Sequence, residues 1–230
     1  MLRGAPPSID AELIRPEERG LSGTPAVAAV AGLCLDLAAQ AGARLIVIDG
    51  PQGWRAPGSP VEGKRVCERC THTPGKTGDP GVVTPKTWTR MAMFSIELFD
   101  ALHAAGWPRF SGEWPAARAT IESFPTQGWR RLGFPPLPGS RRRELRLKAW
   151  MGHLTTAFGV RWPRDPSHDE LQAVVAGLGG LLLLREGVTA CDVHGHKPFV
   201  ENGVWREGYI LGPRAGAIET CRRCAGEEIV

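Results

Sequence analysis

The stretch LIVIDGPQGW, residues 45–54, decides the fold class. Four branched apolar residues run directly into Asp49, and a Gly-Pro turn follows. A continuous apolar run, in contrast to an alternating one, is typical of a strand that is buried on both faces in a parallel or mixed sheet. Such a strand would hold the Asp49 carboxylate at the rim of the sheet, where ligands gather in open α/β folds.

The rest of the chain alternates segments typical of helices and strands. Residues 24–42 combine a Thr-Pro start, apolar residues at helical spacing and a closing glycine, which predicts a helix directly before the strand. This order predicts an α/β fold with a mixed sheet flanked by helices. Further helices are predicted over residues 85–105, 139–159 and 167–187, a strand over 117–125, a hairpin around Glu201, Asn202 and Gly203, and a final strand over 208–213.

Length and composition narrow the class of protein. A chain of 230 residues suits one α/β domain, and we expect a single domain over residues 1–230 with a long loop at 51–85. The net charge of +4 allows an anionic partner such as nucleic acid. The longest apolar run, residues 174–184, is about half of a bilayer span, and no signal peptide is evident. We therefore expect a cytoplasmic protein without a membrane partner; no sequence feature indicates an oligomeric state.

Carboxylates follow both predicted strands. Glu122 ends the strand at 117–125 as Asp49 ends the first, and Asp169 lies in the first turn of a predicted helix. Converging acids require a cation, and oxygen ligands select Mg or Mn, which would support phosphodiester hydrolysis. Each acid also has a plainer interpretation: an Asx turn for Asp49, a surface acid for Glu122 and helix-dipole stabilisation for Asp169.

Several segments together resemble the predicted RNase H-like nuclease family, a domain family of unknown function. They are LIVIDGPQGW, RVCERCTHTPGKTG, IESFPTQGWRRLGFPPLP, SHDELQAVVAGLGGLLL and EGYILGP, which occur in the order of that family over roughly residues 40–213. The resemblance implies an RNase H-like mixed sheet flanked by helices. It also implies a nuclease or phosphodiesterase activity that depends on a divalent metal, with Asp49, Glu122 and Asp169 as catalytic and metal-binding residues.

The chain departs from that family at two places. Relatives begin with a strand that carries a further aspartate, whereas the nearest candidate here, Asp10, has poor flanks for a strand. Gln172 stands where relatives have a second helical aspartate, and a neutral amide is a weaker metal ligand. Both departures favour an alternative function: a catalytically inactive module of the same fold that binds nucleic acid or protein.

Basic residues are expected to contact the phosphate backbone of a nucleic acid. Candidates occur in the long loop and around the proline-rich bend after the second strand, and two tryptophans near the strand ends are candidates for stacking on bases. The alternative is a solvated helix face with the tryptophans in the core. The candidate substrate-binding residues are Arg65, Lys76, Arg130 and Arg141, and the two tryptophans are Trp54 and Trp129.

Paired cysteines suggest a structural zinc ion. Cys221 and Cys224 form a Cys-x-x-Cys pair in the tail at residues 214–230, where zinc would brace the chain. Two ligand sets are compatible with the spacing, and both use this C-terminal pair. It would combine either with Cys67 and Cys70 or with Cys191 and His194. The alternative is that the cysteines are reduced and bind no metal, as is common inside cells.

Overall fold

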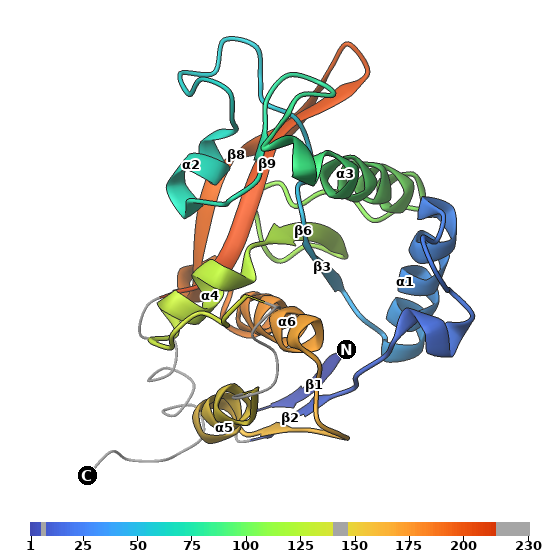
Figure 1. The fold of residues 1–230 in the computed structure, drawn as a ribbon, viewed down its shortest axis with the longest axis vertical. Helices are drawn as coiled ribbons and strands as arrows, with labels where there is room; N and C mark the ends of the chain where they lie inside the picture. Colours follow the sequence, from blue (N-terminus) through green and yellow to red (C-terminus); the bar gives the residue numbers. More distant parts are fainter. Residues whose placement is uncertain (6–7, 140–146, 215–230) are drawn as a thin grey trace. The chain divides into compact units, whose positions relative to one another are not determined.

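The computed structural model describes residues 1–5, 8–139 and 147–214. They form an α/β protein in which sheet strands of mixed direction are flanked by helices, which confirms the predicted class at this coarse level (Figure 1). The elements in chain order are β1 (Leu2–Ala5), β2 (Ser8–Ala11), η1 (Pro16–Arg19), α1 (Val27–Ala41), β3 (Leu45–Asp49), α2 (Val66–Thr71), β4 (Lys76–Thr77), β5 (Val83–Thr84), η2 (Lys86–Trp88), α3 (Thr89–Ala104), β6 (Ala119–Ser123), α4 (Pro125–Arg131), α5 (Leu147–Phe158), β7 (Val160–Arg161), α6 (His168–Glu186), η4 (Val188–Ala190), β8 (Cys191–Glu201) and β9 (Val204–Pro213).

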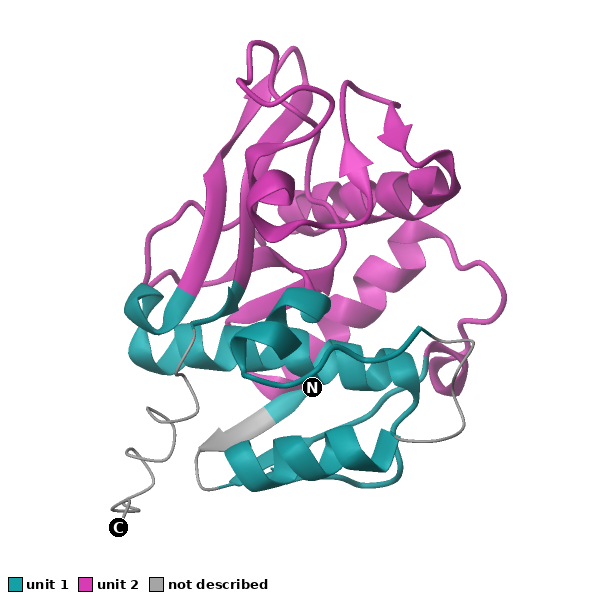
Figure 2. Ribbon diagram, turned by 60° about the vertical axis from the view of Figure 1, so that its left-hand side comes forward, with its two compact units in different colours: residues 1–15, 125–191, 212–230 teal, residues 16–124, 192–211 magenta. Residues whose placement is uncertain are grey.

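The chain gathers into two compact units (Figure 2). Unit 1 comprises Met1–Arg15, Pro125–Cys191 and Gly212–Val230, and unit 2 comprises Pro16–Phe124 and Asp192–Leu211. Each unit is therefore assembled from segments that lie far apart in the sequence. The sequence predicts one domain with a single long loop, and this division into two units is a feature that it did not indicate.

The main sheet has the strand order β3-β6-β9-β8. β3 and β6 pair in parallel, in a register that places Leu45 opposite Ala119 and Asp49 opposite Ser123. β6 also pairs in parallel with β9. The predicted strand after residue 44 is confirmed, and its continuous apolar sequence has a physical reason, because the side chains of both faces are at least partly covered.

β8 and β9 form the predicted hairpin. Its tip is the pair Asn202 and Gly203, whose φ angles of 52° and 75° both lie in the left-handed region. A two-residue turn of this kind matches the twist of the strands that it joins, and it favours Asn-Gly because these residues tolerate positive φ. The hairpin delivers β9 to the middle of the main sheet, next to β6.

Helices α1 and α3 build the core of unit 2 together with β3. Leu98 and Leu102 of α3 pack with Ala31 and Ala38 of α1, and Ile48 lies against this cluster. α1 ends at Gly42, which adopts a left-handed conformation with φ 58°, so the predicted C-terminal signal is confirmed. α3 contacts β6 of the main sheet and leaves Arg90 and Met91 in its first turn exposed.

The long loop predicted at residues 51–85 contains regular structure of its own. It forms the helix α2 and the small two-stranded sheet β4-β5, which the sequence did not indicate. These elements are short, so their hydrophobic periodicity is too brief to recognise. Their side chains take part in the buried cluster of the candidate functional site.

Unit 1 contains a second, smaller sheet with the order β1-β2-β7. β2 is antiparallel to β1 and parallel to β7, and its Ile9 is buried in the core of the unit. The expectation that no strand carries Asp10 is corrected here, because Ser8–Ala11 is a strand. Asp10 itself is exposed and accepts two hydrogen bonds from Arg161, at 2.6 and 2.7 Å.

The helices α4, α5 and α6 supply the rest of unit 1. α6 begins with the predicted capping box: the Ser167 hydroxyl accepts a hydrogen bond from the Glu170 amide at 3.2 Å. In return, the Glu170 carboxylate accepts one from the Ser167 amide at 2.6 Å. Behind this cap the helix is apolar, and Leu171 and Val175 are buried in the core of unit 1.

Candidate functional site

Asp49 and Glu122 lie on opposite faces of the main sheet. The register of β3 and β6 pairs Ile48 with Glu122 and Asp49 with Ser123. Because paired residues of neighbouring strands share a face and successive residues alternate, the Asp49 side chain points away from the face of Glu122. Asp49 is exposed and Glu122 is buried. The structure therefore does not bring these two predicted metal ligands together on one face.

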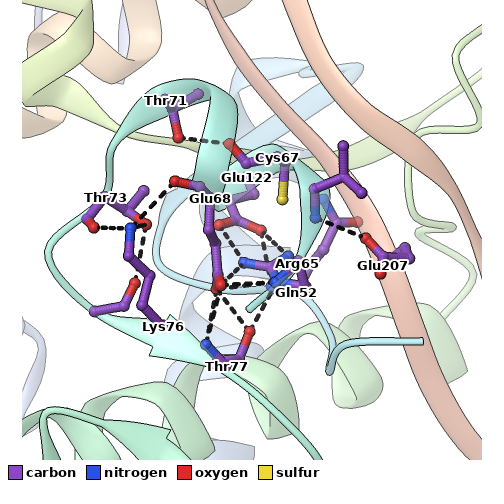
Figure 3. Close-up of polar contacts among 12 residues, drawn as sticks. Gln52, Arg65, Cys67, Glu68, Thr71, Thr73, Lys76, Thr77, Glu122 and Glu207 are labelled. Carbon is purple, nitrogen blue, oxygen red and sulfur yellow. Dashed lines mark hydrogen bonds and ion pairs between the residues drawn. The ribbon is translucent and has the colours of Figure 1, made fainter. Parts of the chain in front are cut away.

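Glu122 is held by Arg65 in a forked ion pair (Figure 3). Arg65 Nη1 donates to Glu122 Oε2 at 2.8 Å and Arg65 Nη2 donates to Oε1 at 2.8 Å. The backbone amide of Gln52 also donates to Oε2, at 3.0 Å. Both side chains of the pair are buried. Three donors occupy most of the lone pairs of this carboxylate, and the neighbouring guanidinium would repel a cation.

The same arginine binds a second carboxylate. Arg65 Nη2 and Nε donate to Glu68 Oε1 at 2.9 and 3.1 Å. Glu68 also accepts the Thr77 hydroxyl at 2.6 Å and the Thr77 amide at 3.1 Å. We call Arg65, Glu68, Thr77 and Glu122 the buried cluster. It joins α2, β4 and β6, which come from three separate parts of unit 2 (Figure 3).

Burial dominates the electrostatics of this cluster. Burial raises the pKa of the Glu122 carboxyl above its ordinary value, while the charge and hydrogen bonds of Arg65 oppose that rise. The adjacent Cys67 thiol is fully buried, and burial raises its pKa well above the usual range. A protonated thiol is a poor nucleophile and a poor metal ligand, so Cys67 acts here as a core residue.

Glu207 of β9 fastens the loop at two further points. Its carboxylate accepts hydrogen bonds from the amides of Ala56 at 3.0 Å and Val66 at 3.2 Å. Gln52 adds a contact in which its side-chain amide donates to the Tyr209 carbonyl at 2.7 Å. A side chain at Gly208 would collide with Gln52, since a Cβ there would lie 2.4 Å from the Gln52 Cδ. The loop is therefore pinned closely onto β9.

Arg65 and Lys76, predicted to bind substrate, make internal contacts instead of extending from a free surface loop. The Arg65 guanidinium is fully buried, which corrects the expectation of an accessible cation. Lys76 is half-buried; its ammonium donates to the carbonyl of Glu68 at 3.2 Å and to the carbonyl of Thr73. Burial lowers the pKa of Lys76. Both cations thus stabilise the loop from within.

Other cations of the same segment are accessible. Arg69 of α2, Lys86 of η2 and Arg90 of α3 are exposed, and Lys64 is half-buried. Trp88 is also exposed, at 37% of its surface. We call these residues the outer loop surface. The elements that carry it are linked within unit 2, because Lys76 joins β4 to α2, β4 pairs with β5, and β5 contacts η2.

Asp169 belongs to unit 1, whereas Asp49 and Glu122 belong to unit 2. Its side chain is 88% exposed and lies 2.9 Å from His168 Nδ1. The next residue, Glu170, is the capping partner and also binds Arg164 Nη1 at 2.8 Å. The predicted capping role of Glu170 is thereby confirmed.

The tryptophans considered for base stacking are core residues. Trp54 and Trp129 are both buried, which is the alternative that the sequence left open. The Trp129 indole donates to the Gln172 side chain at 2.9 Å, so Gln172 has a structural partner. Arg130 is exposed at the end of α4, and Arg141 lies outside the described residues.

The predicted zinc ligands are dispersed or outside the described part of the chain. Cys67 is buried and Cys70 is exposed on α2, Cys191 is buried at the start of β8, and Cys221 and Cys224 fall beyond residue 214. In the described residues of either unit, no three side chains of His, Cys, Asp or Glu are grouped so that they could hold a metal ion. The zinc and the Mg or Mn site stay predictions.

Comparisons with family models, curated proteins and solved structures gave no match to this chain. Among the described helices, none is both long enough and apolar enough to cross a membrane. The fold and the geometry above are therefore the basis for assigning a function.

Proposed function

We propose that this protein binds nucleic acid through the outer loop surface. The observation that supports the proposal is the contrast within one segment of unit 2. Its buried side holds Arg65, Glu68 and Glu122 in a closed ion-pair cluster, while its outer side exposes Arg69, Lys86 and other cations beside a tryptophan. The buried cluster fixes the backbone of this segment. The exposed cations that the segment carries attract the phosphates of a nucleic acid.

Charge supports an anionic partner for this surface. From residue 80 to residue 96 the chain carries Lys86 and Arg90 but no Asp or Glu. The acids on its borders are Asp79, which pairs with Arg55, and Glu97 on α3. An exposed segment with cations, an aromatic ring and no acid is typical of surfaces that bind a nucleic-acid strand.

A second candidate function is metal-dependent cleavage of a phosphodiester. Asp49 favours it, since this acid is exposed at the carboxyl end of β3, where ligands bind in open α/β folds. The resemblance to the predicted RNase H-like nuclease family also favours it and implies an RNase H-like arrangement of the strands. In this candidate Mg or Mn would activate water, and Glu122 would have no place among the ligands because Arg65 binds it.

Binding of labelled oligonucleotides at several salt concentrations tests the first candidate. We expect R69A/K86A to weaken binding and to reduce the slope of log K against log salt by about 0.7–0.9 for each lost phosphate contact. The matched control is R19A/R185A, which also removes two exposed positive charges but lies outside the surface. Equal slopes for both double variants would contradict the proposal.

Cleavage assays with and without manganese test the second candidate. Asp49→Asn should abolish metal-dependent cleavage, whereas binding in the absence of metal should persist. Ser123→Ala, which changes the residue opposite Asp49 without removing a charge, is the control. Cleavage that survives in the Asp49 variant would exclude this site.

A further inference from the structure

Trp88 differs from every other tryptophan of the chain. The structure describes all eight tryptophans, and Trp88 alone has an exposed side chain. The others are core residues, donate an indole hydrogen bond, or lie against a cation or an aromatic ring. Trp88 has no such partner in the described part of the chain. An aromatic ring that is 37% exposed and has none of these partners is available to an external ligand.

The ring is held in place although it is exposed. Its backbone lies in the short helix η2, where the Trp88 amide donates to the Pro85 carbonyl at 3.0 Å. Gly75 packs against the ring, because a Cβ at that position would lie 3.5 Å from three of its atoms. A fixed ring loses little conformational entropy when a flat ligand stacks on it.

The charged residues near Trp88 indicate an anionic ligand. Lys86 and Arg90 are exposed two residues before and after Trp88, and no acid lies within residues 80–96. Met91 beside them is 38% exposed and adds apolar surface. An exposed aromatic ring in a segment that carries exposed cations and no acid suits a base of a phosphate-linked strand. Bases within a duplex are stacked on each other and closed to such a ring.

We infer that Trp88 is a stacking platform for an unpaired base, so that the protein prefers single-stranded nucleic acid to duplex. The exposed cations of the same segment, Lys86 and Arg90, then attract the phosphates of that strand. This inference rests on the proposed nucleic-acid-binding function and specifies its ligand. It assigns to Trp88 the stacking role that the sequence gave to Trp54 and Trp129, which are buried.

The test compares labelled single-stranded and duplex oligonucleotides of equal length at one salt concentration. We expect Trp88→Ala to weaken single-strand binding roughly 5- to 150-fold, the range for loss of one stacked base, and to leave duplex binding nearly unchanged. Trp88→Phe should retain most of the affinity. The salt slope should not move in either variant, because neither removes a charge.

Controls separate the possible failures. Thermal unfolding of each variant shows whether the fold is intact, and Trp162→Phe, which changes a tryptophan of unit 1, should leave binding unchanged. If R69A/K86A weakens binding but Trp88→Ala does not, the stacking inference is overturned and the proposed function stands. If the wild type binds neither form of nucleic acid, both are overturned.

Discussion

The arginine–glutamate cluster of Arg65 and that of Arg164 use the same chemistry in different surroundings. In unit 2, Arg65 binds Glu68 and Glu122, and all three side chains are at least 96% buried. In unit 1, Arg164 binds Glu170 at the start of α6, where the arginine side chain is 31% exposed. The first cluster lies in the core, whereas the second lies at the capped start of a helix, where Arg15 is also 3.5 Å from Glu170.

The pKa values of Glu122 and Glu170 are shifted in opposite directions. Burial raises the pKa of Glu122, although Arg65 opposes the rise. The hydrogen bond from Arg164 is the largest influence on Glu170, and it lowers the pKa of that carboxyl to about 2. A glutamate at the end of a strand is thus no evidence for a metal ligand by itself, because its surroundings decide whether its charge is available.

Removal of Arg65 should have the largest effect. Arg65→Ala leaves Glu68 and Glu122 buried without a cation, and we expect a loss of about 3–5 kcal/mol in the free energy of unfolding. Chemical denaturation measures this loss. Arg65→Lys keeps the charge but not the fork, so it should restore only part of the stability. A variant as stable as the wild type would contradict the structural role of the cluster.

Removal of the charge of Glu122 should have a smaller effect. Glu122→Gln keeps the shape and one acceptor oxygen but turns a charged partner of Arg65 into a neutral one, which should cost about 1–3 kcal/mol. Chemical denaturation at neutral pH gives the value. Glu62→Gln is the matched control, since Glu62 is exposed in the same unit, and it should leave stability within about 0.5 kcal/mol of wild type. Equal losses of stability in the two variants would contradict a special structural role for the buried Glu122.

A change in the partly buried cluster of unit 1 should lower the stability less still. Glu170→Ala removes the capping box and the ion pair with Arg164, and we expect a loss of about 1–2 kcal/mol. Thermal and chemical unfolding of this variant and of Arg164→Ala provide the measurement. A loss as large as that of Arg65→Ala would mean that burial does not decide which of the two clusters contributes more to stability.

The contribution of Glu170 to stability should also depend on pH. The pKa of Glu170 falls on folding from its ordinary 4.5 to about 2, so its contribution is present above the ordinary value and is lost as the pH falls toward about 2. We expect the stability difference between wild type and Glu170→Gln, about 1 kcal/mol at neutral pH, to shrink over this interval. A constant difference between about pH 6 and about pH 2.5 would contradict the shift.

Sequence patterns predicted the local features of the fold and missed those that depend on distant contacts. The strand ending at Asp49 and the cap at Ser167 were recognisable because neighbouring residues encode them. The burial of Arg65 was not, since its partner Glu122 lies 57 residues further along the chain. The three-residue spacing of Arg65 and Glu68 was the one signal that could have suggested an ion pair.

The candidate site shows the same limit. Asp49 and Glu122 both follow a strand, and the sequence pattern cannot reveal the register that turns them to opposite faces. In the same way, Trp54, Trp88 and Trp129 look alike in a sequence. The packing of helices and sheets buries two of them and leaves Trp88 exposed beside cations.

The most direct test is the free energy of unfolding of wild type and Glu122→Gln, each measured with and without millimolar manganese. If the Glu122 carboxyl belongs to Arg65, the substitution lowers stability in both conditions, and any stabilisation by manganese is the same in the two proteins. If Glu122 is instead a metal ligand, manganese stabilises the wild type alone, and without metal the two proteins are equally stable.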